Sequence, residues 1–184
     1  MHVHGHGKAA ELAQQLKPAL DLIGRVPRKS ATDISASPSF TAKPVEVVED
    51  KLNVKSLEKT IGHKPDRNGA VIKFTIGRDD LKVREMGAPI NARMGLNTWA
   101  ALVGTDENAA IAGDVAMLES EVNPVLKALR SHQLEVVAIH HHMFGTQPQI
   151  IFLHYWGIGP AAKLAEGFKA ALNELGKGQG HAMR

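Results

Sequence analysis

Four of the ten histidines of this chain lie in one short stretch, Glu135 to Gly159. His140 and His142 are two residues apart, and His154 follows in the next apolar run. Residues i and i+2 of a β-strand point to the same side, roughly 6.5–7 Å apart, so the first two imidazoles share a face. Two imidazoles placed in this way can bind one metal ion, with nitrogen–zinc bonds of about 2.0–2.1 Å. The pattern predicts a site for a divalent metal such as zinc.

Two acidic residues precede the same stretch. Glu119 and Glu121 lie just before a predicted helix, and either can serve as a fourth ligand or as a general base beside a metal-bound water. Their alternative role is to place negative charge near a helix N-terminus. The histidines, in turn, can be surface residues, hydrogen-bonded core residues or part of a pocket for a small molecule. No reaction is identified by these residues, so the sequence leaves open whether the protein is an enzyme.

The predicted positions of the histidines depend on a hairpin. Residues 134–142 and 149–156 are apolar runs typical of strands, and residues 145–148 are turn-forming. A loop of five residues, 145–149, would pair His140 with His154 and place three histidines on one face. A loop of two or four residues would instead place His154 on the face of His141. The odd loop is favoured because it gathers three histidines beside Trp156.

The remaining elements predict an α+β fold. Further strands are expected at residues 70–76, 96–103 and 109–118, and helices at 56–61, from Asn123-Pro124, and from Pro160 to Gly176. This order predicts a largely antiparallel sheet with helices packed on one face, ending in a β-hairpin followed by a helix.

The composition excludes several kinds of site. The chain has no cysteine, which excludes disulfides, thiolate metal sites and cysteine nucleophiles. Its net charge of +3 is not gathered into a basic cluster, so we predict no nucleic-acid partner. No apolar run approaches the ~20 residues of a membrane span. The first ten residues, MHVHGHGKAA, lack the pattern of a signal peptide.

An internal repeat links the two ends of the chain. Residues 1–24 align without gaps on residues 153–176 with 11 of 24 positions identical, including His2 with His154. This repeat predicts that residues 1–24 are the last strand and helix of a preceding unit, in an N-terminally truncated two-repeat protein. Residues 25–52 are then a linker, 53–176 a complete domain and 177–184 a flexible tail. The second face of the sheet is expected to pack on a sister repeat or on a second copy of the chain.

Several stretches together resemble a known family. They are NGAVIKFTIGRDDLKV, MGLNTWAALVG, GDVAMLESEVNPVLKALRSHQLEVVAIHHHM and PQIIFLHYWGIGPAAKLAEGFKAAL. They are similar to the LppY/LpqO family, a bacterial group classed as a domain of unknown function. The resemblance implies two such units behind an export or lipoprotein signal, and therefore a location in the bacterial envelope or outside the cell. The family's His-x-His and later strand histidine match His140, His142 and His154.

Two hypotheses follow for the function. The first is a divalent-metal or small-ligand site at the histidines, in which metal binding weakens at acidic pH because imidazole ligates only in its neutral form. The second is a non-catalytic binding or assembly module of the envelope, in which the histidines are structural and residues 1–24 dock on a neighbouring unit.

Overall fold

The computed structural model describes residues 5–22 and 43–177. The chain divides into two compact units, Met1–Ala42 and Lys43–Arg184. Most of the predicted linker (residues 25–42), the tail from residue 178 onward, and His2 of the repeat fall outside the described residues. Among the described residues, no helix has the length and apolar character needed to cross a membrane.

The described part of the first unit is a single helix, α1 (Ala9–Leu20). Lys17 and Asp21, one turn apart, form an ion pair of 2.9 Å on its surface. None of its residues is buried, and Leu20 is 53% exposed.

The second unit is built on a six-stranded sheet in the order β1-β2-β5-β6-β8-β7, in which all neighbours are antiparallel. The strands are β1 (Asp66–Asn68), β2 (Val71–Gly77), β5 (Asn97–Gly104), β6 (Ala109–Met117), β7 (Glu135–His140) and β8 (Ile151–Gly159). The helix α4 (Ala161–Leu172) follows the β7–β8 hairpin directly. This arrangement confirms the predicted α+β fold.

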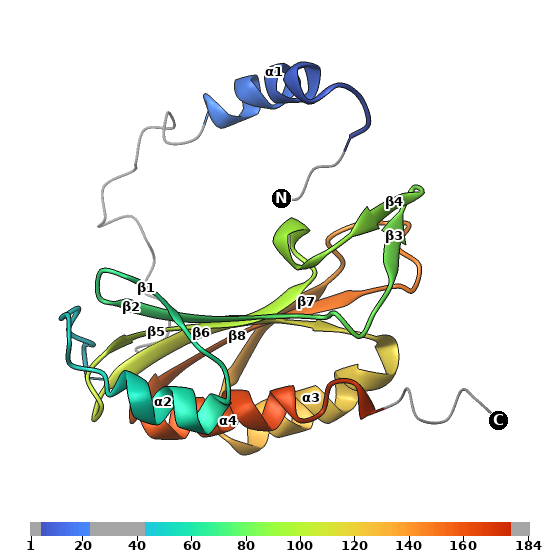
Figure 1. The fold of residues 1–184 in the computed structure, drawn as a ribbon. Coiled ribbons are helices and arrows are strands. Elements are labelled where there is room, and N and C mark those ends of the chain that lie inside the picture. The colour runs from blue at the N-terminus through green and yellow to red at the C-terminus, as the bar shows by residue number, and fades with distance from the viewer. Residues whose placement is uncertain (1–4, 23–42, 178–184) are drawn as a thin grey trace, which may run out of the picture. The chain divides into compact units, whose positions relative to one another are not determined.

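Three helices cover one face of this sheet, as Figure 1 shows. They are α2 (Val54–Ile61), α3 (Glu119–Ser131) and α4. Burial alternates along β5, as expected for a strand with one face against a core. The core between helices and sheet includes the fully buried Leu129 and Phe168 from the helices, and Phe74, Ile111 and Tyr155 from the sheet.

The opposite side, here called the open face, carries a small ribbon. The ribbon consists of β3 (Val83–Glu85) and β4 (Ala88–Ile90), followed by the short helix η2 (Ala92–Met94). Figure 1 shows the ribbon on the side of the sheet opposite α2, α3 and α4. A second apolar cluster includes Val83 of the ribbon, Ala116 and Phe152 of the sheet, and Ile150. The ribbon therefore covers only one end of the open face, and Trp156 beyond it is 39% exposed.

The start of α3 differs from the prediction. Asn123-Pro124 was expected to begin the helix, but α3 begins at Glu119 and Pro124 lies inside it. Glu121 accepts a hydrogen bond of 2.8 Å from the backbone nitrogen of Leu118, which satisfies a donor at the helix start. With this cap, the helix begins five residues before Pro124.

Candidate metal centre

Three histidines converge on the open face. One ring nitrogen from each of His140, His142 and His154 lies within 4.8 Å of the others. His140 ends β7, His154 lies in the middle of β8, and His142 belongs to the connecting loop. The ring centroid of His140 lies 5.0 Å from that of His142 and 4.8 Å from that of His154. The predicted trio is therefore brought together by the fold.

The hairpin register explains this convergence. Ala138 pairs with His154, and His140 pairs with Phe152. His140 and His154 thus share the open face, as the odd loop predicts. The predicted direct pairing of His140 with His154 is wrong by two residues. The last pair joins His140 to Phe152 and encloses the eleven residues 141–151, an odd number, rather than residues 145–149.

The fourth member of the site, Asp114, was missed by the sequence analysis. It lies in β6, directly opposite His154 in the β6–β8 pairing, and it is only 4% exposed. Its Oδ1 is 3.8 Å from Nδ1 of His154, and its Oδ2 is 3.8 Å from Nε2 of His142. The available signal was a single acidic residue inside the otherwise apolar strand AAIAGDVAM.

Asp114 is in an electrostatically unfavourable position. Burial raises the pKa of its carboxyl group above the ordinary value, although charge on His154 and His140 and hydrogen bonds from the backbone of Val115 and Leu153 oppose the shift. Its Oδ1 makes no hydrogen bond to any residue that the structure describes. A buried carboxylate oxygen without a donor is costly, and a bound cation would remove that cost. The carboxyl group therefore fits a metal site better than a purely structural one.

The ring of His142 is oriented by stacking. It lies against Phe152 with a centroid distance of 3.4 Å and an angle of 2° between the rings. Its side chain is 16% exposed, compared with 35% for His154. Stacking and partial burial restrict the ring to an orientation in which Nε2 faces Asp114.

The donor distances allow a simple fit test. In a tetrahedral zinc site with bonds of about 2.05 Å, neighbouring donors lie about 3.3 Å apart. The histidine nitrogens are separated by up to 4.8 Å, so the imidazoles would need to move together by about 1.5 Å at most. Side-chain rotation can supply this movement, and the three histidines therefore fit a metal ion, with Asp114 beside their group of converging ligand atoms and not within it.

The two predicted glutamates are not brought to the histidines. Glu121 is buried at the start of α3, where both carboxylate oxygens bind the guanidinium of Arg78 at 2.7 and 3.0 Å. It also accepts hydrogen bonds from the backbone nitrogens of Leu118 and Gly176. Glu119 is exposed on the first turn of α3. Glu121 therefore caps the helix and neutralises a buried arginine, and neither glutamate belongs to the group of converging ligand atoms.

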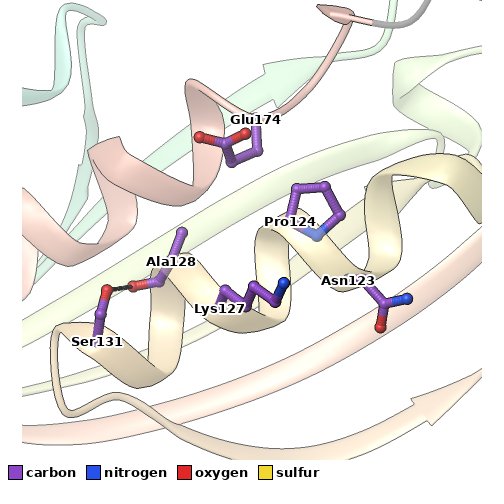
Figure 2. Close-up of a pocket in the computed structure, with 6 residues that line it drawn as sticks. All are labelled: Asn123, Pro124, Lys127, Ala128, Ser131 and Glu174. Carbon is purple, nitrogen blue, oxygen red and sulfur yellow. Dashed lines mark hydrogen bonds between the residues drawn. The ribbon is translucent and has the colours of Figure 1, made fainter.

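A hollow on the helical side has a different character. Figure 2 shows it along α3 and beside the turn after α4. Its volume is about 630 Å³. It is lined by Asn123, Pro124, Lys127, Ala128, Ser131 and Glu174. The Ser131 hydroxyl donates to the carbonyl of Ala128 at 2.9 Å, so it is already engaged. The lining offers no converging set of ligand or nucleophilic groups, and it lies on the other side of the sheet from the histidines.

Comparison with known proteins gives one match. A family model described as Domain of Unknown Function (DUF1259) matches residues 55–174. No curated protein matches the chain, and no solved structure does. The matched range contains the whole of the three-histidine and Asp114 cluster.

Proposed function

Because the chain belongs to the DUF1259 family, which carries no assigned activity, we propose a function from the site itself: His140, His142, His154 and Asp114 bind a divalent transition metal. The observation that carries this proposal is the convergence of three imidazole nitrogens beside a buried carboxylate oxygen that has no hydrogen-bond donor among the described residues. Sets of imidazole and carboxylate ligands suit zinc, and they also suit manganese, iron and copper.

The position of Asp114 defines two chemical uses of the metal. If Asp114 ligates directly, four protein ligands close a tetrahedral site, and the metal stabilises the sheet and the loop. If Asp114 instead accepts a hydrogen bond from a metal-bound water, three histidines leave one position open for hydrolytic chemistry. A small anion such as azide can enter only a site with an open position. A change in the absorption spectrum of bound Co²⁺ on addition of azide therefore separates the two uses.

The first test is metal content. His2, His4 and His6 alternate near the N-terminus and could bind metal independently, so all proteins carry alanine at these three positions. We expect about one metal ion per chain by plasma mass spectrometry after reconstitution with zinc, manganese or copper. The His140→Ala/His142→Ala variant should lose this metal.

The matched control removes two histidines outside the cluster. Among the described residues, the ring of His63 hydrogen-bonds with the carbonyl of Ile61. The ring of His132 hydrogen-bonds with the carbonyl of Ala128 and the hydroxyl of Ser131. The His63→Ala/His132→Ala variant should therefore retain the metal. Absence of metal from the parent protein under all three reconstitutions would refute the proposal.

A second candidate function is an assembly module, and exposed apolar side chains favour it. Val137 and Ile139 on the edge strand β7 are 66% and 46% exposed, and Phe144 in the following loop is 94% exposed. An exposed strand edge with apolar side chains can pair with another chain. The envelope location and the two-repeat parent implied by the LppY/LpqO resemblance belong to this candidate and remain proposals.

A further inference from the structure

The three histidines are held in different ways. His140 and His154 are fixed by strand pairing within the sheet. His142 lies beyond the last paired residue of β7, in the connection that spans residues 141–150. Its position therefore depends on what holds this loop, not on the sheet hydrogen bonds.

The loop is attached to the ribbon by hydrogen bonds. Arg84 and Gln147 exchange two backbone hydrogen bonds of 3.1 and 2.9 Å, which form an isolated antiparallel bridge. The carboxylate of Glu85 accepts a hydrogen bond from the backbone nitrogen of Gly145, with Oε2 and Oε1 at 3.1 and 3.4 Å. Two neighbouring residues of β3 thus hold two nearby residues of the loop.

Apolar packing joins the same elements to the ring of His142. Ile150 at the end of the loop and Val83 of β3 belong to one buried cluster with Phe152. Phe152 is the residue on which the His142 ring stacks. A shift of the ribbon would therefore alter both the backbone and the ring environment of His142.

Glu85 is unusual for its position. It is 5% exposed, whereas a residue buried under a small ribbon is ordinarily apolar, because burying a carboxylate is costly unless it is hydrogen-bonded. An apolar residue could fill this space but could not accept the hydrogen bond from Gly145. A side-chain oxygen at position 85 thus holds the loop by accepting this hydrogen bond.

We propose that Glu85 is a positioning residue, which holds the loop so that His142 reaches the metal. This proposal rests on the proposed function, since it assigns the element that delivers the third imidazole. Glu85 acts through the Gly145 backbone and the His142 ring, and the ribbon serves as the support of the metal site. Outer residues of this kind typically change metal affinity by 10–100-fold when they are removed.

The experiment uses the full chain with alanine at His2, His4 and His6, and it compares Glu85→Ala, Glu85→Gln, His142→Ala and the Glu85→Ala/His142→Ala double variant. Zinc affinity is measured by competition with a chromophoric chelator, and the absorption of bound Co²⁺ reports the ligand set. We expect Glu85→Ala to weaken zinc binding about 10–100-fold. Glu85→Gln, whose amide oxygen can still accept the hydrogen bond, should restore most of the affinity.

The double variant decides whether Glu85 acts through His142. If it does, Glu85→Ala should produce no further loss of affinity in a protein that already lacks His142. Additive losses, or an unchanged affinity in Glu85→Ala, would overturn the proposal.

A measurement on the metal-free protein tests whether Glu85 holds the loop, separately from whether the histidines bind metal. Amide hydrogen exchange at Gly145 and Gln147 should accelerate in Glu85→Ala, while amides of the central strand β6 remain protected. Unchanged exchange would overturn the holding role even if zinc binding were weaker. A parent protein that binds no metal would instead refute the proposed function, and with it the role of Glu85 at a metal site, whatever the exchange shows.

Discussion

Asp114 is the residue at which stability and function oppose each other. Its carboxyl group is 4% exposed, and burial raises its pKa. In the folded protein the carboxyl group therefore retains its proton more strongly than in the unfolded chain. As the pH rises from the pKa of this carboxyl group in the unfolded chain through its higher pKa in the folded protein, ionisation of Asp114 lowers the free energy of unfolding of the metal-free protein. A residue with this effect is a candidate for a chemical role, such as the proposed binding of metal.

We expect Asp114→Asn to stabilise the metal-free protein at pH 7 and to weaken its binding of metal. The stabilisation should be on the order of 1 kcal/mol, the range for a buried polar group that lacks a partner. The difference in the free energy of unfolding between variant and parent should grow from pH 4 to pH 7, because only the parent must bury a carboxylate there. Urea denaturation in the presence of a chelator measures it.

An exposed aspartate provides the control for this comparison. Asp66 in β1 is exposed, and Asp66→Asn should change the free energy of unfolding by no more than a few tenths of a kcal/mol. If Asp114→Asn were destabilising at every pH and still bound metal, Asp114 would be a structural residue.

At the scale of elements, the site depends on how closely β6 and β8 approach. Gly113 lies opposite Tyr155, and a Cβ atom at Gly113 would lie 2.1 Å from the tyrosine ring. The hydroxyl of Tyr155 reaches across to donate to the carbonyl of Trp99 at 3.2 Å. The absence of a side chain at Gly113 therefore allows a fully buried ring to cross the strand beside Asp114.

Gly113→Ala should consequently destabilise the protein by about 2–3 kcal/mol, since the ring is buried and cannot move away without disturbing its neighbours. Thermal or urea denaturation of the metal-free protein measures the loss. Gly159, in the neighbouring strand β8, is the matched control, because a Cβ atom there would have no other atom within 4 Å. Equal stability of Gly113→Ala and Gly159→Ala would contradict the packing argument.

At the scale of the whole molecule, the second unit has a core of its own. The buried clusters contain residues 52–171 only, and no residue of α1 is buried. We therefore expect a protein that starts at residue 43 to unfold cooperatively at the same urea concentration as the full chain. Denaturation followed by circular dichroism, with light scattering for the molar mass, measures both stability and assembly. A full-length dimer that dissociates and loses stability on this deletion would favour the assembly function.

The local parts of the fold could be predicted from the sequence, because they depend on neighbouring residues. Alternation of apolar residues predicted the strands, and the odd loop placed His140 and His154 on one face. The exact register could not be predicted, because the length of the connection is set by contacts with the distant residues Arg84 and Glu85. The start of α3 was placed too late because the side chain of Glu121 caps a helix that begins five residues before Pro124.

The incomplete prediction of the site has the same cause. Glu119 and Glu121 are close to the histidines in sequence, but a helix start on the far side of the sheet separates them in space. Asp114 lies only five residues before Glu119 in sequence, but it belongs to β6, and the pairing of β6 with β8 makes it a neighbour of His154. Pairings between distant segments of this kind are not encoded in local patterns.

The two tryptophans of the chain are both placed beside the proposed metal centre. Trp99 is the cross-strand partner of Asp114, and Trp156 follows His154 by two residues on the same face. A paramagnetic ion such as Cu²⁺ quenches indole fluorescence at such short range, whereas Zn²⁺ does not. The intrinsic emission of the protein should therefore fall as copper fills the site and recover when a chelator removes the copper, so the molecule provides its own optical reporter of occupancy.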